Sequence, residues 1–269
     1  MKKLIVFLIL LNLGSVAAAE KPEGWAAAPK KPMDWAAKPP PFTTAKKRLF
    51  KIYQRYGLTR TFYCGCQFSP KTHQVDLKTC TQLKPSKRGK QLEWEHLVPA
   101  SRIGHRSWTK KDFAKTCQTA TNPKTCTTAK IRGNNRALGN PYNLVPSSGA
   151  ANVARSNRRM VDFAETDPAH SVCTLRIDEQ ANQVEPADSL KGRVARAYLY
   201  MDQSVFQCGL LTTAERTRYR GWNDVYPATP RECYWAAVIR AETQVPNLLL
   251  KKACGQEGRG LAKGITKCP

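Results

Sequence analysis

Several features that would place this chain in a familiar class are missing from its sequence. Its longest apolar run, residues 4–13, has ten residues with a polar break at Asn12, whereas a membrane-spanning helix needs roughly 20. Neither G-x-G-x-x-G nor G-x-x-x-x-G-K-S/T occurs, which excludes the phosphate-binding loops built on those motifs. Histidine is scarce, with four residues, and acidic residues number only 20.

Positive charge is correspondingly abundant. Lysine and arginine number 44 against 20 aspartate and glutamate, which gives a formal net charge of +24. An excess this large indicates a polyanionic partner, of which nucleic acid is the commonest. The alternative interpretation of the charge alone is a basic surface kept for solubility or for contact with anionic lipid.

The N-terminus has the pattern of an export signal. Residues 1–19 begin with Lys2 and Lys3, continue through the apolar run, and end in small residues up to Ala19. This pattern predicts a secretory signal peptide that is cleaved after Ala19. A membrane anchor is the alternative, but the apolar run is about half the roughly 20 residues that a span needs.

A proline-rich segment, residues 20–43, follows the signal. It repeats the motif K-P-x-x-W-A-A, which places Trp25 and Trp35 ten residues apart. Because dense proline disrupts helices and strands, we expect a semi-extended and weakly ordered tail. Docking of the tryptophans on the domain or on a partner is the alternative. Residues 44–269 are then expected to form a single domain.

The ten cysteines predict five disulfides, because the exported chain meets an oxidising compartment. Cys117 and Cys126 are close enough in sequence to close a local loop, and spacing alone fixes no other pair. Cys64 and Cys66 are separated by one residue and no matching pair of ligands follows them, which argues against a zinc site.

The hydrophobic pattern predicts an α+β fold with short strands and no parallel sheet, because no regular alternation of strand and helix occurs. Residues 110–130 are polar and cysteine-bridged, so we expect an irregular excursion there. The expected helices cover residues 45–56, 149–163, 192–201, 212–226 and 230–244, and the expected strands cover residues 59–68, 91–98 and 142–145.

One set of polar residues suits the hydrolysis of a phosphodiester. His96 can act as a base near neutral pH. Glu95 and Asn152 offer the oxygen ligands that a hard divalent cation prefers, and such a cation can stabilise the negative charge that develops on the phosphate. Each residue also has a purely structural interpretation, as a core histidine, a strand carboxylate or a polar residue at a helix start.

This hypothesis depends on local geometry. Consecutive strand residues point to opposite faces, so Glu95 and His96 can share a site only if the strand bends or ends at these positions. On the following helix Asn152, Arg155 and Arg159 are spaced to share one face. Arg155 is therefore expected to hold the substrate phosphate through its guanidinium group. A solvated basic face is the alternative.

The motifs around these residues resemble those of the endonuclease I family, which are periplasmic or secreted bacterial non-specific nucleases with a ββα-metal (His-Me finger) core. The resemblance covers roughly residues 45–255 and is strongest in W-E-H-x-V-P-A followed by N-L-x-P-S. It also takes in EWEHLVPAS (93–101), GAANVARSN (149–157), FYCGC (62–66), the loop between two cysteines at 117–126, RAYLYM (196–201) and KKAC (251–254).

The resemblance implies cleavage of DNA, with RNA as a second expected substrate, to products with 5′-phosphate ends. It assigns His96 as the general base and Glu95 and Asn152 as ligands of a single divalent ion. That ion is expected to be Mg²⁺, although Ca²⁺ can occupy such sites. The protein is expected to be periplasmic or secreted, monomeric and not membrane-bound.

The sequence departs from the family pattern in three places. The small disulfide loop lacks the family's phosphate-holding arginine, so Lys124 is expected to be a weak substitute beside Arg155. Cys208 and Cys268 are additional to the family's usual eight cysteines and are expected to pair with each other. Residues 132–141 (RGNNRALGNP) form an extra basic segment, which we expect to be flexible and to contact the substrate backbone.

Two other classes of protein fit parts of the sequence. A secreted basic protein could bind nucleic acid without cutting it, and the intact set of Glu95, His96 and Asn152 argues against that alternative. A membrane-active cationic protein would carry a basic amphipathic helix with a broad apolar face, and residues 45–56 match that pattern only in part.

Overall fold

The computed structural model describes residues 32–80, 83–103, 111, 114–115, 117–167, 169–255 and 268. The expected signal peptide and the first W-A-A repeat with Trp25 lie outside these residues.

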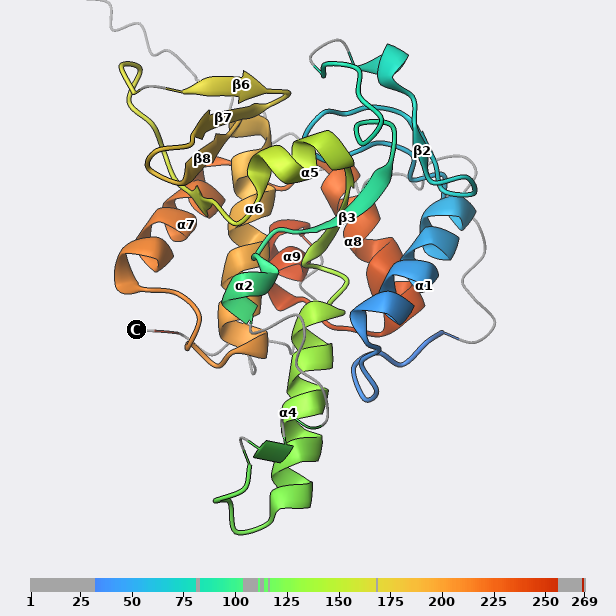
Figure 1. The fold of residues 1–269 in the computed structure, drawn as a ribbon, viewed down its shortest axis with the longest axis vertical. Coiled ribbons are helices and arrows are strands. Elements are labelled where there is room, and N and C mark those ends of the chain that lie inside the picture. The colour runs from blue at the N-terminus through green and yellow to red at the C-terminus, as the bar shows by residue number, and fades with distance from the viewer. Residues whose placement is uncertain are drawn as a thin grey trace, which may run out of the picture.

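Helices surround three small sheets, so the described residues have the predicted α+β fold (Figure 1). The longer helices are α1 (Phe42–Arg55), α4 (Pro123–Leu138), α6 (Asp188–Tyr200), α7 (Thr213–Val225) and α8 (Pro230–Thr243). The shorter ones are η1 (Leu77–Thr79), α2 (Ala100–Ile103), α5 (Gly149–Arg155), the π-helical turn η2 (Met201–Val205) and α9 (Leu248–Ala253). None of the helices among the described residues is long and apolar enough to cross a bilayer.

Two of the sheets are antiparallel pairs and the third has four strands. The pairs are β1 (Phe68–Ser69) with β2 (Gln74–Val75), and β3 (Leu92–His96) with β4 (Leu144–Ser148). The third sheet has the order β5 (Arg159–Met160), β8 (Gln183–Pro186), β7 (Leu175–Asp178) and β6 (His170–Val172). As expected, none of the sheets among the described residues is a parallel sheet, but the third sheet is mixed, because β5 and β8 pair in parallel. The β6–β7 hairpin between them makes a connection long enough for parallel strands.

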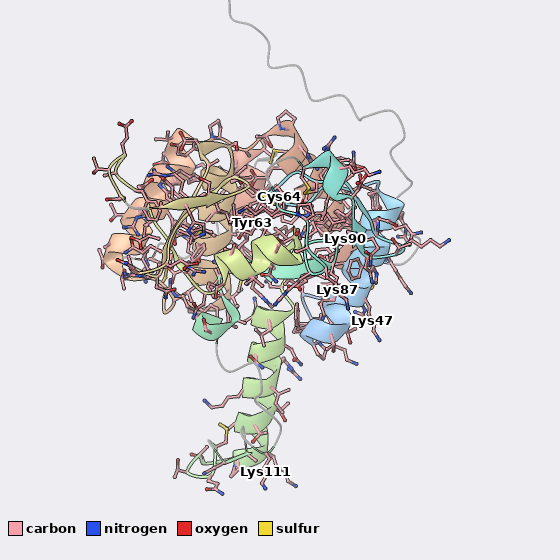
Figure 2. All side chains as sticks on the ribbon, turned by 45° about the horizontal axis from the view of Figure 1, so that its top comes forward. Lys47, Tyr63, Cys64, Lys87, Lys90 and Lys111 are labelled. Atoms are coloured by element: carbon pink, nitrogen blue, oxygen red, sulfur yellow. A yellow bond between two sulfur atoms is a disulfide. The ribbon has the colours of Figure 1, made fainter. Side chains whose placement is uncertain are left out.

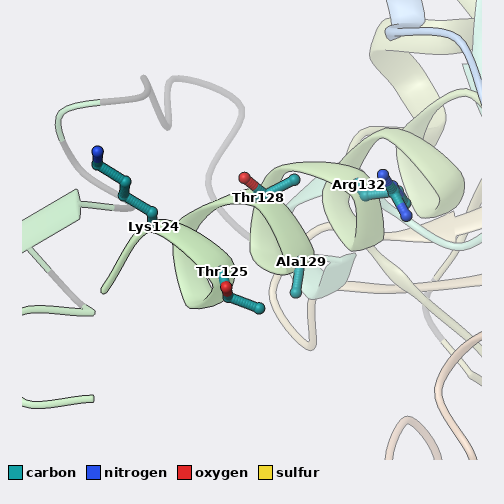
Figure 3. Close-up of a pocket in the computed structure, with 5 residues that line it drawn as sticks. All are labelled: Lys124, Thr125, Thr128, Ala129 and Arg132. Carbon is teal, nitrogen blue, oxygen red and sulfur yellow. The ribbon is translucent and has the colours of Figure 1, made fainter. Parts of the chain in front are cut away.

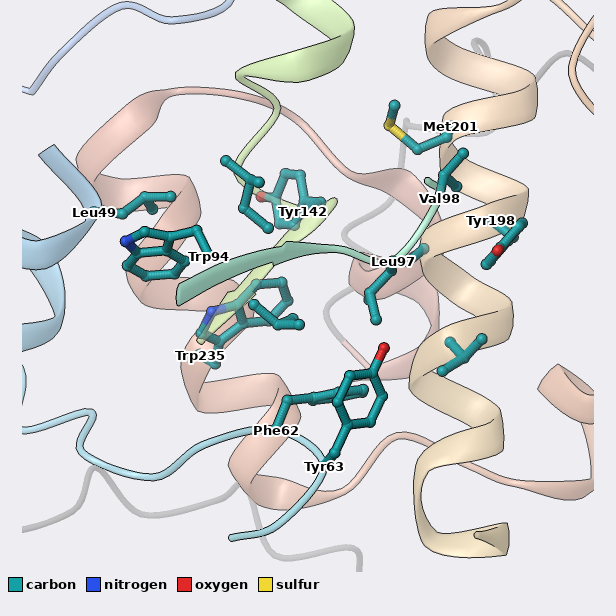
Figure 4. Packing of buried hydrophobic residues seen from close by; sticks show 14 of the residues in the cluster. Leu49, Phe62, Tyr63, Trp94, Leu97, Val98, Tyr142, Tyr198, Met201 and Trp235 are labelled. Carbon is teal, nitrogen blue, oxygen red and sulfur yellow. The ribbon is translucent and has the colours of Figure 1, made fainter. Parts of the chain in front are cut away.

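An aromatic core fixes one face of β3 (Figure 4). The ring of Trp94 meets that of Tyr53 edge-on, with centroids 5.0 Å apart. The indole of Trp235 on α8 donates to the Tyr53 hydroxyl at 2.8 Å, and Tyr142 packs edge-on against Trp235. Edge-on packing of this kind suits the charge distribution of aromatic rings, so α1, β3 and α8 are joined through their largest side chains.

The second W-A-A repeat is packed on the domain, so the expectation of a weakly ordered tail was wrong for this part. Trp35 is 2% exposed, and the guanidinium of Arg48 lies over its ring at 5.9 Å. The amides of Met33 and Trp35 donate to the carbonyl oxygens of Glu242 and Thr243 at 2.9 and 3.0 Å. Burial of an indole and these hydrogen bonds together offset the cost of ordering a proline-rich chain.

Helix α4 occupies much of the region that we expected to be irregular and flexible. The Asn122 side chain accepts a hydrogen bond from the Thr125 amide at 3.1 Å, and Pro123 takes the first helical position. Both are favourable at a helix start, and the helix then runs through the RGNNR sequence to Leu138. As a result α4 projects from the body of the molecule (Figure 1).

The chain between α1 and β1 forms a turn where we expected a strand. Its only strand-like pairing is a bridge between Arg60 and Gln67. Disulfides hold this turn, and all ten cysteines are paired as the sequence predicted, including the local pair and the additional pair. The five bonds are Cys64–Cys173, Cys66–Cys80, Cys117–Cys126, Cys208–Cys268 and Cys233–Cys254.

The boundaries of β4 and α5 also differ from the prediction. Strand β4 continues through Pro146, which is paired with Trp94; in a two-stranded sheet the edge of the strand tolerates a proline. Helix α5 ends at Arg155, well before residue 163, because Ser156 has a φ of 51°, a left-handed conformation that helices do not continue through.

We expect Trp35→Ala to lower the free energy of unfolding by about 3 kcal/mol, because it empties a buried indole site. Urea denaturation of the full chain measures this change. Val225→Ala removes an apolar side chain that is 67% exposed and should change stability by less than about 0.5 kcal/mol. Equal effects of the two substitutions would show that Trp35 is not docked.

Candidate active site

The candidate site is built on the unit of β3, β4 and α5. In the antiparallel pair Glu93 lies opposite Ser147 and Glu95 opposite Val145, and α5 follows β4 without a loop and contacts both strands. A Cβ atom at Gly149 would lie 2.6 Å from the Arg88 carbonyl oxygen and 2.7 Å from Glu93 Oε1. Glycine at this position therefore allows the start of α5 to approach β3.

Glu93 connects β3 to the first turns of α5. It forms an ion pair with Arg88, with Nε 2.9 Å from Oε1, and it accepts a hydrogen bond from Asn152 Nδ2 at 2.6 Å. Because Nδ2 points to this carboxylate, the amide oxygen of Asn152 is the atom oriented for a different partner. No role for Glu93 was predicted from the sequence, although alternation along the strand puts it on the same face as Glu95.

Glu95 and Arg155 form a buried ion pair. Arg155 Nη1 lies 3.2 Å from Glu95 Oε1, and the two side chains are 0% and 6% exposed respectively. The Tyr63 hydroxyl donates to the same oxygen at 3.3 Å. Burial opposes the charge of Arg155, but the Glu95 carboxylate and the neighbouring tyrosines together outweigh it, so the pKa of Arg155 lies above its ordinary value. Burial and then the carboxylate raise the pKa of Tyr63, so the phenol stays protonated.

The guanidinium group of Arg155 therefore binds groups of the protein itself. Its guanidinium donates to the carbonyl oxygens of His96 and Leu97 and to the Tyr198 hydroxyl at 3.1 Å. The structure does not support Arg155 as the group that holds the phosphate, because a fully buried side chain does not reach a solvent-borne ligand. Arg159 does not share its helical face either, because it lies in β5.

His96 is the last residue of β3, as the geometric argument required. It is 6% exposed, its Nε2 lies 2.9 Å from the Leu138 carbonyl oxygen, and its ring centroid is 4.6 Å from that of Phe42. Beyond it the Asn143 side chain bonds both the amide and the carbonyl of Val98, at 2.7 and 3.1 Å. This amide clamp turns the chain sharply away from the strand.

The structure brings the predicted residues together only in part. Glu95 contacts α5, whereas His96 contacts α1 and the end of α4, so the two side chains have different partners on the two sides of β3. Asn152 lies one helical turn before Arg155, the partner of Glu95. All three predicted residues nevertheless belong to one ββα unit.

Lys124 is not brought to this site. It lies at the N-terminal end of α4 (Figure 3), whereas Leu138, the residue that contacts His96, lies at the other end. The two residues are 14 positions apart in the helix, which corresponds to about 21 Å at 1.5 Å per residue. Lys124 therefore cannot hold a phosphate that His96 also reaches.

The oxygen donors of this unit fit a hard divalent cation better than a soft one. Among the described residues no group of three or more His, Cys, Asp and Glu side chains is arranged to hold a metal ion. Carboxylates at Glu93 and Glu95 and the amide oxygen of Asn152 are instead the donors present. Mg²⁺ is commonly held by one or two carboxylates, with water and substrate phosphate completing its shell.

An antiparallel pair of strands followed by a helix, with glutamate and histidine at the strand end and asparagine on the helix, is the arrangement expected of a ββα nuclease. The comparison with protein families agrees with this class. The model of the Endonuclease I family matches residues 41–215. The chain belongs to the endonuclease I family and is an endonuclease.

Relatives of known name cover most of the chain. An extracellular deoxyribonuclease of Aeromonas hydrophila is 36% identical over 198 residues, which cover 71% of this chain and 80% of the relative. A periplasmic deoxyribonuclease of the same species is 34% identical, covering 71% and 77%. An extracellular endonuclease of Pseudomonas fluorescens biotype A is 30% identical over 231 residues, covering 81% and 91%.

We expect Arg155→Met to lower the free energy of unfolding by about 3–5 kcal/mol, because it leaves the Glu95 carboxylate buried without its partner. The double variant Glu95→Gln/Arg155→Met should cost less than the two single variants added together. Urea denaturation of all three variants measures the coupling. Arg159→Met, at an exposed position, is the matched control; simple additivity would argue against the ion pair.

Proposed function

We propose that this protein is a metal-dependent endonuclease of the periplasm or the cell exterior that hydrolyses DNA and RNA to products with 5′-phosphate ends. The proposal rests mainly on one observation, that Glu95, His96 and Asn152 all belong to the same β3–β4–α5 unit. The relatives named as extracellular and periplasmic deoxyribonucleases support both the DNA substrate and the location.

His96 is the proposed general base. A carbonyl oxygen only accepts hydrogen bonds, so the 2.9 Å contact with the Leu138 carbonyl requires the proton to be on Nε2. Nδ1 is then the nitrogen that can take a proton from the attacking water. The Leu138 carbonyl thus selects the tautomer, and the ring of Phe42 limits the orientation of the imidazole.

Glu95 and Asn152 are the proposed ligands of the divalent ion, Mg²⁺ or Ca²⁺. When bound, such an ion stabilises the negative charge that develops on the phosphate oxygens. Glu93 orients Asn152 by accepting from its Nδ2, and Arg155 and Tyr63 orient Glu95. Partners of this kind hold ligands in place and commonly affect metal affinity by 10- to 100-fold.

The phosphate of the substrate needs positive groups other than Arg155. Lys87 and Lys90 are exposed on the chain that leads into β3, and Lys47 of α1 lies near them in the view of Figure 2. Helix α1 packs against Trp94 of β3 through Phe50 and Tyr53, so all three lysines belong to segments next to β3. They are suited to contacts with the nucleic acid backbone, which supply affinity without sequence preference.

We expect His96→Ala to lower kcat on plasmid DNA by roughly 10²- to 10⁴-fold, the usual contribution of a general base. Affinity for DNA should change little, because it comes from many phosphate contacts. Nicking assays in Mg²⁺ and binding assays in EDTA measure the two effects. His170→Ala, at an exposed position of β6, is the control.

The same assays distinguish an endonuclease from the alternative, a basic protein that binds nucleic acid without cutting it. If the wild-type protein binds DNA but cuts none of four substrates in Mg²⁺, namely single- and double-stranded DNA and RNA, it is a nucleic-acid-binding protein and the proposal fails. Cleavage that persists in EDTA would contradict the proposed dependence on metal.

Asn152→Ala should weaken the apparent affinity for Mg²⁺ by at least about tenfold, while the fold is retained because Asn152 is only half-buried. Calorimetric titration of Mg²⁺ into the protein without DNA tests this independently of activity. The control is Asn157→Ala, an exposed asparagine just after α5. An unchanged titration of Asn152→Ala would remove this residue from the ligand set.

A further inference from the structure

A cleft of about 900 Å³ lies between the docked N-terminal segment and α4. One wall consists of residues 33–41 with the start of α1, and the other consists of residues 128–135 of α4. In Figure 1 the N-terminal segment lies below α1 and beside the part of α4 nearest the body of the molecule. Residues 33–40 precede the range matched by the endonuclease I family.

The two walls come together where Pro40 approaches Gly139. A Cβ atom at Gly139 would lie 2.2 Å from the Pro40 carbonyl oxygen, so a glycine at the end of α4 allows the walls to touch. Phe42, two residues after Pro40, packs on the ring of His96, and the carbonyl of Leu138, the residue before Gly139, contacts its Nε2. The part of the cleft lined by Pro40 is therefore close to the proposed general base.

The lining of the cleft combines positive charge with apolar surface. Lys38 and Arg132 are exposed, one on each wall. The carboxylate of Asp34 accepts a hydrogen bond from the Ala37 amide at 2.8 Å, which stabilises the turn of the segment. The apolar part of the lining comes from Met33, Ile131 and three consecutive prolines at 39–41.

We propose that this cleft binds a short stretch of one nucleic acid strand beside the scissile bond. The inference rests on the proposed function, because it takes His96 as the point of cleavage. Lys38 and Arg132 meet phosphates of the strand, and the apolar lining meets bases and sugars, the combination that non-specific single-strand sites use. A cavity of this volume holds a molecule of drug size, so it admits a few linked nucleotides and not a double helix.

Trp35 acts in this scheme as a positioning residue. Its buried indole anchors the N-terminal segment, together with the backbone hydrogen bonds from residues 33 and 35 to the end of α8. The wall is therefore held in place by a contact remote from the strand itself. The second W-A-A repeat is thus an anchor that the sequence interpretation did not connect with the substrate.

Binding of a labelled 12-nucleotide single strand, measured by fluorescence anisotropy in EDTA, tests the inference without any turnover. Lys38→Gln/Arg132→Gln should weaken binding roughly tenfold, and it should reduce the slope of log K against log salt by about 1.4, since each single-strand phosphate contact contributes about 0.7. Lys78→Gln/Lys252→Gln removes the same charge from exposed positions elsewhere and should change the slope by less than half as much.

Trp35→Ala leaves the charge unchanged and should also weaken single-strand binding, because it releases the wall; circular dichroism confirms that the variant is folded. Equal losses for the cleft pair and the control pair would overturn the inference. So would an equal loss of affinity for a 12-base-pair duplex, which would place the contacts outside the cleft. Because these measurements exclude metal, a failure of cleavage would count against the proposed function alone.

Discussion

The buried pair of Glu95 and Arg155 is the contact on which the rest of the unit depends. Neither charge is solvated, so each needs the other to remain stable in the interior. The same guanidinium bonds the carbonyl oxygens of His96 and Leu97, so it fixes the carboxylate, the end of β3 and the last turn of α5 together. The position of Asn152, one turn earlier on α5, follows from this arrangement.

Local signals in the sequence were sufficient for the elements whose boundaries depend on neighbouring residues. The apolar stripe of α1, which includes Leu49, Ile52 and Tyr53, is buried as the helical spacing indicated. Thr212 and Glu215 form a capping box that starts α7. The end of β3 at His96 was also predicted. Side chains alternate along any regular strand, so Glu95 and His96 could share a site only where the strand bends or ends.

The features that the sequence did not predict depend on contacts between distant residues. Helical spacing places Arg155 on a face, but only packing decides whether water or protein lies there. Leu138 and His96 are in contact although they are 42 positions apart in the sequence, and Tyr63 and Glu95 although they are 32 apart. No local sequence pattern predicts either contact. Lys124 was expected near the phosphate because it lies in the disulfide loop where the family carries its phosphate-holding arginine. In the structure the Asn122 cap starts α4 beside Lys124, and the helix places this residue far from His96.

The bond between Cys64 and Cys173 links residues 109 positions apart and adjoins the tyrosine that donates to Glu95. The Thr174 hydroxyl reinforces this link by donating to the Tyr63 carbonyl oxygen at 2.7 Å. In a chain with reduced thiols, only noncovalent contacts keep that phenol beside the carboxylate. The hydrogen bond from Tyr63 to Glu95 is therefore coupled to the redox state of the compartment in which the chain folds.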